Sequence, residues 1–409
     1  MPDISPLSFD NTANAFEYKT NKQLKKARFL FSSMGIEWLV QLGTRITPWA
    51  IKIGLPITGI IRSTIFDQFV GGETLQQTAI VADKLEAFHV QVILDYGVEG
   101  GDYGEAEKDH ARDEFIRVIE YAATQQNIPF MSIKVTGLAR FSLLEQMDAA
   151  MNKAEGTLIK KYEKVVSELS IDEKNEWQLV CNRMLLICQT ASIKNVAVLI
   201  DAEETWIQDP VDALTTLMMD AFNKTKAVVY NTAQLYRHDR LQFVKDCYQA
   251  AEQRNFILGI KLVRGAYMEK ERKRAEEMNT PSPIQSTKEN SDKDYNEAVV
   301  FCLNNINRIA TIVASHNEQS NFLAAQLLDE MGLPHNHEHV HFSQLYGMSD
   351  NITFNLAKAG YSVSKYLPFG PIKDVIPYLM RRAQENSSVS GQTGRELGLI
   401  KKELLRRGV

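Results

Sequence analysis

The sequence predicts an α/β protein in which residues 89–409 fold as a TIM-type (β/α)₈ barrel and residues 1–88 form an N-terminal helical arm or cap. Within the barrel segment, eight short runs rich in apolar and β-branched residues alternate with longer segments of helical periodicity. Continuous apolar strands separated by helices are typical of a parallel sheet covered on both faces. Eight such units in about 300 residues favour a closed barrel. An open doubly wound sheet should show a glycine fingerprint after its first strand, and this sequence has none there.

The arm is predicted to be helical because its apolar residues recur at three- and four-residue spacing. Examples are Phe31, Met34, Trp38 and Leu42. The most hydrophobic stretch of the chain, Trp38–Phe66, is interrupted by basic residues and by prolines. It therefore lacks the run of about 20 apolar residues that a membrane-spanning helix needs.

The predicted strands follow the apolar runs of the barrel segment. They are Val92–Tyr96, Phe130–Lys134, Val196–Asp201, Ala227–Asn231, Leu258–Val263, Thr311–Ser315, His339–Phe342 and Ser362–Tyr366. Polar residues gather at or near their C-terminal ends, namely Asp95, Lys134, Asp201, Asn231, Lys261 with Arg264, Ser315 with His316, Gln344 and Tyr366. One polar strand end signifies only contact with solvent, but barrel enzymes build their sites at this face. Together these residues predict a functional site.

The composition bounds the class of function. The chain has 46 basic and 51 acidic residues and a net charge of −5, so it carries no basic excess for a nucleic-acid backbone. Its four cysteines lie far apart without a CxxC pair, which indicates buried thiols in a reducing compartment rather than disulfides or a zinc site. The N-terminus shows neither a secretory signal nor an Arg-rich transit peptide. We therefore expect a cytoplasmic protein.

Two pairs of charged residues suggest specific chemistry. Arg381 and Arg382, on what is predicted to be the last helix, can present several donors to one carboxylate, as recognition of an amino or keto acid requires. Lys134 and Asp201 lie at neighbouring strand ends and form either a structural ion pair or a pair that orients a substrate. The polar segment Met278–Tyr295 is predicted to be a loop, either a surface excursion or a lid.

The run HNHEHVH, His335–His341, raises a metal site as an alternative, because alternate residues of a strand share a face. No cysteine lies nearby, and half of the run is expected to be loop. We therefore predict that the chain binds no metal ion.

Several longer motifs resemble the proline dehydrogenase family, and they occur in consistent order from about residue 66 to the C-terminus. They are QFVGGET (Gln68–Thr74), SIKVTGL (Ser132–Leu138), IDAE (Ile200–Glu203), KLVRGAYMEKER (Lys261–Arg272), ASHN (Ala314–Asn317), QLYGM (Gln344–Met348), YLPFG (Tyr366–Gly370) and PYLMRRAQEN (Pro377–Asn386). The resemblance implies a distorted (β/α)₈ barrel that binds FAD. It also implies oxidation of L-proline to Δ1-pyrroline-5-carboxylate by hydride transfer from C5 to the flavin, the first step of proline catabolism to glutamate. In this chemistry the flavin carries out the redox step, and the protein orients the substrate and the cofactor and provides the electrostatic environment.

The resemblance assigns the substrate to one group of residues. Arg381 and Arg382 would bind the proline carboxylate, with Lys134 beside them. Tyr366 would pack on the ring carbon opposite the nitrogen. Leu345 and Tyr267 would wall the pocket.

The resemblance assigns catalysis and cofactor binding to a second group. Asp201 would hold the arginines and set the charge of the site, together with the cations Lys261 and Arg264. The FAD contacts would be Gln234, Arg264, Gly265, Ala266, Ser315 and His316, with Ala202 nearby. Lys261 stands where some bacterial members carry arginine. Lysine keeps the positive charge but cannot donate the two parallel hydrogen bonds of a guanidinium.

Three alternatives compete with this prediction. A hydroxyproline dehydrogenase would share the scaffold, but its tyrosine in the YLPFG motif is a serine, and Tyr366 fills that space here. A barrel hydrolase or aldolase using Lys134 and Asp201 would be colourless rather than yellow. A non-catalytic binding module is disfavoured, because a site that had lost its activity would not be expected to retain a group of charged residues whose clustering costs stability.

The resemblance also implies partners. The electron acceptor is expected to be a quinone, which lies in lipid, so Trp38–Phe66 either docks peripherally on the inner face of a membrane or covers the barrel. Because the chain ends at Val409, soon after the arginine motif, the next oxidation is expected to belong to a separate pyrroline-5-carboxylate dehydrogenase.

Overall fold

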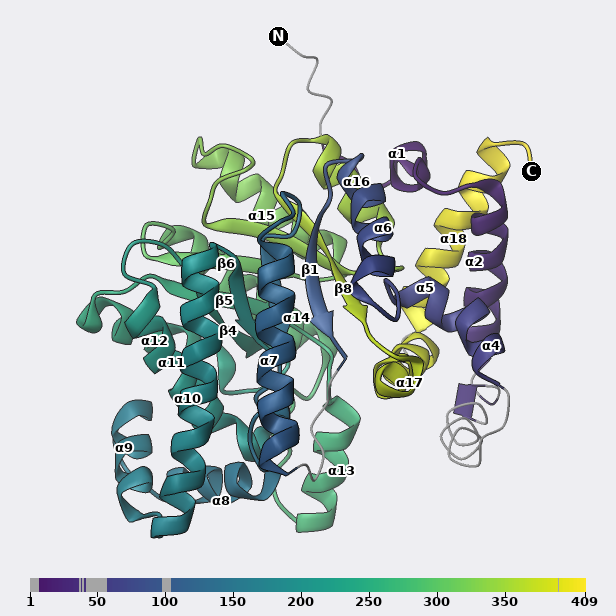
Figure 1. Ribbon diagram of the computed structural model, residues 1–409. Helices are drawn as coiled ribbons and strands as arrows, with labels where there is room; N and C mark the ends of the chain where they lie inside the picture. The colour runs from purple at the N-terminus through teal and green to yellow at the C-terminus, as the bar shows by residue number, and fades with distance from the viewer. Residues whose placement is uncertain (1–6, 37, 39, 42–56, 98–103, 389) are drawn as a thin grey trace. The chain divides into compact units, whose positions relative to one another are not determined.

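The computed structural model describes residues 7–36, 38, 40–41, 57–97, 104–388 and 390–409. Its strands form a closed parallel barrel in the order β1 to β8, with helices between successive strands, so the predicted fold class is confirmed (Figure 1). The chain divides into two compact units, Met1–Gly97 with Phe342–Val409, and Val98–His341. The predicted division of the chain at residue 88 stays a prediction.

All eight predicted strands are present; β5 has the predicted bounds, and each of the others differs at one end or both. They are β1 (Gln91–Tyr96), β2 (Phe130–Ile133), β3 (Ala197–Ile200), β4 (Val229–Gln234), β5 (Leu258–Val263), β6 (Ile309–Ala314), β7 (Val340–Leu345) and β8 (Val363–Phe369). The C-terminal end of β4 was predicted wrongly, because the strand continues through Thr232 to Gln234. The Thr232 hydroxyl donates to the Ile200 carbonyl at 2.7 Å, which satisfies a polar group inside the sheet. Asn231 therefore lies within β4 rather than at its end.

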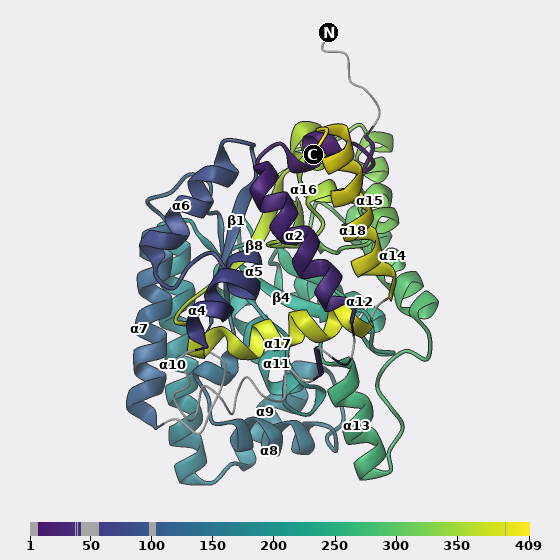
Figure 2. The same ribbon diagram turned by 90° about the vertical axis from the view of Figure 1, so that its right-hand side faces the viewer.

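The first unit holds β1, β7 and β8 and nine helical segments among its described residues. These are α1 (Thr12–Phe16), α2 (Asn21–Met34), α4 (Thr58–Ile61), the π-helix η1 (Arg62–Phe66), α5 (Asp67–Phe69), α6 (Leu75–Glu86), α16 (Asp350–Lys358), α17 (Ile372–Ser388) and α18 (Ser390–Arg406). A capping box between Thr20 and Gln23 starts α2, which satisfies backbone donors at the helix end. Helices α2 and α18 run side by side, and α17 passes beneath them (Figure 2). Phe31, Phe69 and Leu379 pack in one apolar cluster of this unit.

One sequence prediction for this unit needs correction. The arginine motif was expected on the last helix, but α17 is followed by α18. Trp38, which continues the apolar spacing of Phe31 and Met34, lies in a helical segment as predicted and exposes 66% of its surface. Leu42 and residues 42–56 of the stretch Trp38–Phe66 lie outside the described residues. Among the helices that the structure describes, none is both long enough and apolar enough to span a membrane.

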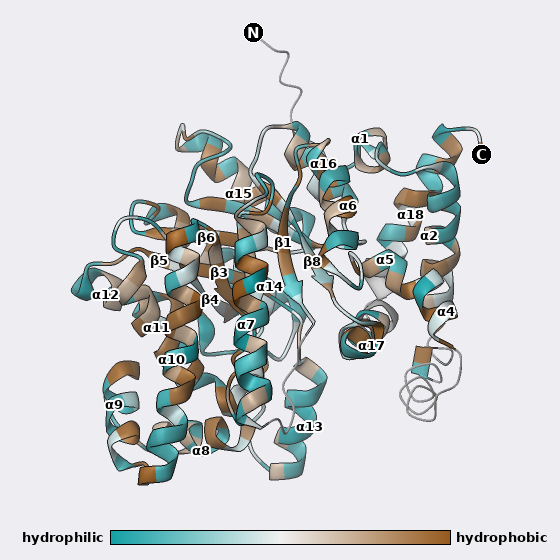
Figure 3. Cartoon of the chain, in the orientation of Figure 1, coloured by the Kyte–Doolittle hydropathy of each residue, from teal (hydrophilic) through white to brown (hydrophobic). Residues whose placement is uncertain are grey.

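The second unit holds strands β2 to β6. Its helical segments are α7 (Glu105–Ala122), the 3₁₀ turn η2 (Val135–Gly137), α8 (Phe141–Met151), α9 (Leu158–Glu168), α10 (Ile171–Lys194), α11 (Thr205–Phe222), α12 (Arg240–Arg254), α13 (Met268–Met278), α14 (Lys288–Asn304) and α15 (Glu318–Glu330). Strand β5 has the mainly apolar sequence LGIKLV, whereas α13 is coloured mainly hydrophilic in Figure 3. Cys188, Cys247 and Cys302 are buried as predicted, and Cys181 is half-buried.

The segment predicted as a loop between Met278 and Tyr295 is shorter in the structure. The Thr287 side chain accepts from Asn290 N, which caps α14, and Tyr295 is fully buried within that helix. The early turns of α14 are mostly polar, so the sequence showed no apolar periodicity there. Residues 279–287 form the remaining loop, where Gln285 N donates to the Tyr236 carbonyl at 2.8 Å. This bond ties the loop to the segment that follows β4.

Candidate active site

A buried cluster of charges centres on Asp201, the residue that follows β3. Lys261 of β5 donates from Nζ to Asp201 Oδ1, and Lys134, the residue after β2, places Nζ 3.4 Å from Oδ2. All three residues are at most 8% exposed. Since β4 separates β3 from β5 in the sheet, we infer that the contact between Asp201 and Lys261 runs through the barrel interior.

The charge state of Asp201 follows from these neighbours. Burial disfavours the ionised carboxylate, but the ammonium groups of Lys261 and Lys134 outweigh burial and hold the Asp201 pKa well below its ordinary value. Asp201 is therefore ionised at neutral pH. Lys134 and Lys261 thus share one ionised carboxylate in a buried place.

Ser132 completes the cluster and was not singled out from the sequence. Its hydroxyl donates to Asp201 Oδ1 at 2.7 Å. Ser132 lies two residues before Lys134, so the two side chains share a face of β2. That two-residue spacing within the motif SIKVTGL was a usable signal.

Glu203 is a second buried carboxyl that the sequence analysis did not select. It lies two residues after Asp201, and it accepts from the Thr136 hydroxyl at 2.8 and 3.0 Å. Burial raises the Glu203 pKa to about 7, with Lys134 opposing the shift and Glu204 adding to it. The carboxyl groups of Asp201 and Glu203 therefore differ in protonation near neutral pH, although they lie on one short segment.

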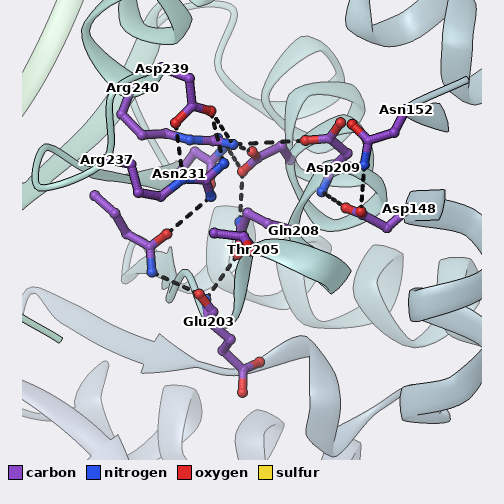
Figure 4. Close-up of polar contacts among 12 residues, drawn as sticks. Asp148, Asn152, Glu203, Thr205, Gln208, Asp209, Asn231, Arg237, Asp239 and Arg240 are labelled. Atoms are coloured by element: carbon purple, nitrogen blue, oxygen red, sulfur yellow. Dashed lines mark hydrogen bonds and ion pairs between the residues drawn. The ribbon is translucent and has the colours of Figure 1, made fainter. Parts of the chain in front are cut away.

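Gln234, predicted to contact the cofactor, is the last residue of β4 and is 2% exposed. Its Nε2 donates to the Glu203 carbonyl at 2.8 Å, and Arg237 Nη1 donates to its Oε1 at 3.4 Å (Figure 4). Ala202, between Asp201 and Glu203, is also buried. The Asn231 side chain is not directed to the C-terminal end of β4, because its amide donates to Asp212 of α11 at 3.0 Å.

Arg264 and Ser315 are brought together at the ends of β5 and β6. Arg264 Nη2 donates to the Ser315 hydroxyl at 2.7 Å and to the Ser320 hydroxyl at 3.0 Å. The Arg264 guanidinium also pairs with Asp292 and lies over the Tyr295 ring, 4.0 Å from its centroid. These contacts hold a half-buried cation beside a hydroxyl, which suits a phosphate or another anion.

The residues after Arg264 make a tight turn into α13. Gly265 has φ +83° and Tyr267 has φ +42°, both in the left-handed region. For a tyrosine this conformation costs roughly 1–2 kcal/mol. Gly265 is exposed, Ala266 and Tyr267 are half-buried, and His316 is half-buried in the turn after Ser315.

The remaining predicted residues lie in the first unit. Leu345 of β7 and Tyr366 of β8 are paired in register, and both are half-buried. Arg381 is half-buried on α17, and Arg382 is 8% exposed with its guanidinium 5.1 Å from the centroid of the Tyr378 ring. The structure thus pairs Leu345 with Tyr366.

The histidines of the run His335–His341 have different contacts, and His337 Nδ1 accepts from His339 N at 3.1 Å. His335 Nε2 lies 2.8 Å from Asp329 Oδ1, and His339 Nδ1 lies 2.6 Å from the Ile306 carbonyl. His341 is buried with its ring 4.8 Å from that of Phe130, and burial lowers its pKa to about 3. In the described part of the chain, no three His, Cys, Asp or Glu side chains are grouped so that they could hold a metal ion.

The donors of the second unit fit a flavin nucleotide. Lys261, Lys134 and Arg264 supply positive charge, and Gln234 and Ser315 supply neutral hydrogen-bonding groups. FAD carries a pyrophosphate and a ring rich in acceptor atoms, so cations and amide donors match its chemistry. Arg264 with Ser315 suits the anionic part, and Lys261 with Gln234 suits the ring.

Comparison with known proteins agrees with this chemistry. The family model described as "Proline dehydrogenase" matches residues 79–395. Proline dehydrogenase 1, mitochondrial, of Dictyostelium discoideum is 32% identical over 388 residues, covering 87% of this chain and 67% of the relative. A hydroxyproline dehydrogenase of Xenopus laevis is 30% identical over 432 residues, covering 98% and 90% of the two chains.

A solved structure shares the fold. Proline utilization A from Bdellovibrio bacteriovorus, inactivated by N-propargylglycine, matches with a TM-score of 0.73 and 20% identity over 98% of this chain. The match spans only 44% of that longer protein. The family match over most of the chain and the relative at 32% identity agree with the motifs found in the sequence, and the chain therefore belongs to the proline dehydrogenase family.

Proposed function

We propose that the chain is an FAD-dependent proline dehydrogenase that oxidises L-proline to Δ1-pyrroline-5-carboxylate. The observation that carries this proposal is the buried cluster in which Lys134 and Lys261 share the carboxylate of Asp201. Two ammonium groups in a buried site favour an anionic substrate and an anionic reduced cofactor. Membership of the proline dehydrogenase family supplies the reaction class.

In this proposal the second unit binds the cofactor. FAD, when bound, accepts the hydride that leaves C5 of proline. Gln234 and Lys261 donate hydrogen bonds to the ring system, and Arg264 with Ser315 binds the anionic part. Asp201 fixes the two lysine side chains, which prevents them from turning away into solvent. Ala202, Gly265, Ala266 and His316 complete the proposed contacts.

The substrate residues act by position. Arg381 and Arg382 hold the proline carboxylate through charge-assisted hydrogen bonds, and Lys134 adds a third cation. Fixing the carboxylate removes rotational freedom before the reaction, which lowers the barrier without chemistry from the protein. Tyr366 packs on the proline ring, with Leu345, its partner in the sheet, and Tyr267 as walls.

A hydroxyproline dehydrogenase is the second candidate, because a relative of that name covers almost the whole chain. The two substrates differ by one hydroxyl on the ring carbon opposite the nitrogen. Tyr366 is half-buried and paired in register with Leu345. In the proposed pocket its aromatic ring would occupy the space that the additional hydroxyl needs. We therefore favour proline as the substrate.

For the electron acceptor we propose a quinone, reached by peripheral contact of a cytoplasmic protein with the inner face of a membrane. Phe29, Trp38 and Ile60 expose 70%, 66% and 66% of their surfaces, which supports such contact. A separate pyrroline-5-carboxylate dehydrogenase would use the product.

The proposal is tested by product analysis. Purified chain supplied with FAD and an artificial quinone is expected to reduce the quinone when L-proline is added and to form Δ1-pyrroline-5-carboxylate, identified by mass spectrometry. The Arg382→Ala variant, which loses a carboxylate-binding group, should need a much higher proline concentration. Quinone reduction with hydroxyproline but not with proline would select the second candidate. No reduction with either would contradict both.

A further inference from the structure

In the second unit, seven residues are linked by hydrogen bonds and ion pairs into a closed ring that includes Gln234. Its members are Gln234, Glu203, Gln208, Asp212, Arg240, Asp239 and Arg237 (Figure 4). Six of them are buried, and only Asp239 is exposed. They lie at the end of β4, in the segments that follow β3 and β4, and on helices α11 and α12, and Glu203 takes part through its backbone.

One half of the ring consists of hydrogen bonds donated by amide groups. Gln234 Nε2 donates to the Glu203 carbonyl at 2.8 Å, and Glu203 N donates to Gln208 Oε1 at 2.9 Å. Gln208 Nε2 then donates to Asp212 Oδ1 at 2.8 Å. The segment that carries Glu203 is therefore fixed from both sides, by β4 and by α11.

The other half of the ring consists of ion pairs. Arg240 Nη1 donates to Asp212 Oδ2 at 2.6 Å, and Arg240 Nη2 lies 3.0 Å from Asp239 Oδ2. Arg237 binds Asp239 through Nε at 3.0 Å and through Nη2 at 2.8 Å. Its remaining Nη1 donates to Gln234 Oε1 at 3.4 Å, which closes the ring.

The ring determines which way the Gln234 amide is oriented. Exchanging its oxygen and nitrogen would place Nε2 against the Arg237 guanidinium and Oε1 against the Glu203 carbonyl, so both contacts would become repulsive. The Gln234 Nε2 atom carries two hydrogens, and among the described residues only the Glu203 carbonyl accepts from this nitrogen. The second N–H therefore has a fixed direction at the end of β4.

Asp212 is the residue on which the ring depends. It is fully buried, and its two oxygens accept from Gln208, Asn231 and Arg240. Burial opposes the charge of Arg240, but the carboxylates of Asp212, Asp239 and Asp209 together outweigh burial and raise the Arg240 pKa above its ordinary value. Without the Asp212 carboxylate, Arg240 would compete with Arg237 for Asp239, and the contact from Arg237 to Gln234 would weaken.

We propose that Asp212 and Arg240 are positioning residues that act through Arg237 to fix the Gln234 amide, and with it the hydrogen bond that Gln234 donates to the flavin ring. This inference rests on the proposed function, because it takes Gln234 as a flavin contact. It extends the site from the strand ends to helices α11 and α12. A substitution of Asp212 or Arg240 is then expected to change FAD affinity and the flavin absorption maximum through Gln234.

The test is a double-mutant cycle on FAD affinity, measured in the full chain by quenching of flavin fluorescence. It compares the wild type, Asp212→Asn, Gln234→Ala and the double variant. If Asp212 acts through Gln234, Asp212→Asn weakens FAD binding about tenfold when Gln234 is present and less than about twofold in the Gln234→Ala background. Asp212→Asn should also shift the flavin absorption maximum in the same direction as Gln234→Ala does.

A matched control is Asp220→Asn. Asp220 lies on α11, as Asp212 does, but its ion pair with Arg254 of α12 is outside the ring. This substitution should leave FAD affinity and the absorption maximum unchanged. If Asp212→Asn fails to fold, Arg240→Lys replaces it in the same cycle, since lysine keeps the charge and loses the fork. An equal loss in both Gln234 backgrounds, or no loss in either, overturns the proposal. A wild-type chain that takes up no FAD instead contradicts the proposed function, so the two failures are distinguishable.

Discussion

Asp201 and Lys261 are bonded to one another although β4 lies between their strands, so the ion pair crosses the barrel interior. Lys134 shares the same carboxylate from β2. This arrangement holds two ammonium groups in a place from which solvent is largely excluded. Because each lysine has a carboxylate partner, charged residues are tolerated in and directly after strands that are otherwise apolar.

Removing the central carboxylate should destabilise the protein strongly. Asp201→Asn leaves Lys134 and Lys261 facing a neutral amide in a buried site, and an uncompensated buried charge costs about 3–5 kcal/mol. The free energy of unfolding from urea denaturation measures this effect. Asp220→Asn, which breaks a more exposed pair with Arg254, should cost less than about 1 kcal/mol. Similar losses in the two variants would contradict the assigned role of Asp201.

Glu203 should make stability depend on pH. Burial raises its pKa from 4.5 to about 7, with Lys134 opposing and Glu204 adding to the shift, while Thr136 donates to the carboxyl. The folded state holds this proton more tightly than the unfolded state does. The contribution of Glu203 to stability is therefore complete below pH 4.5 and is lost as the pH rises through 7.

Glu203→Gln isolates this effect, because glutamine keeps the shape and cannot ionise. The variant should match the wild type at about pH 4 and exceed it at about pH 9 by up to about 3 kcal/mol, measured by urea denaturation. A difference between variant and wild type that is constant across this range would show that the Glu203 carboxyl does not change its charge on folding as described.

Arg264 should contribute to cofactor affinity through its shape as well as its charge. Arg264→Lys keeps the positive charge but loses the paired contacts to Ser315 and Ser320 and the stacking on Tyr295. FAD binding, followed by fluorescence quenching, should weaken about tenfold. Arg254→Lys on α12 tests the same substitution at a partly exposed ion pair and should leave FAD affinity unchanged. Unaltered affinity in Arg264→Lys would remove this residue from the cofactor site.

Tyr366 should set the preference between proline and hydroxyproline. Tyr366→Ser removes the ring, which opens space beside Leu345, and leaves a hydroxyl close to the backbone that can bond the substrate hydroxyl. The ratio of kcat/KM values should therefore move about tenfold or more toward hydroxyproline. Tyr366→Phe keeps the ring and should leave the ratio close to that of the wild type. If the serine variant loses both activities in equal proportion, Tyr366 does not select the substrate.

Much of the fold followed from the sequence because strands of a parallel barrel are buried on both faces and are recognised as continuous apolar runs. The same rule located Lys134, Asp201 and Lys261, since a charged residue in or after such a run must have a buried partner. It was misleading for Asn231, whose partner is Asp212 on the helical layer rather than a group at the strand end.

Other features could not be predicted from local patterns. Ser132 and Glu203 gain their importance from partners on other strands and turns, namely Asp201 and Thr136, which no short window contains. The ring around Gln234 joins residues of two helices and two turns, and its members resemble ordinary surface residues in the sequence. The polar start of α14 concealed a helix because capping by Thr287, rather than apolar spacing, defines where it begins.

The central claim is that the chain uses FAD to oxidise L-proline, and the visible absorption spectrum of the purified protein tests it most directly. The spectrum is recorded without oxygen before and after L-proline is added, with hydroxyproline as the comparison. The account predicts flavin bands that bleach with proline and much less with hydroxyproline. A colourless protein that takes up no FAD, or a bound flavin that proline leaves oxidised, would contradict it.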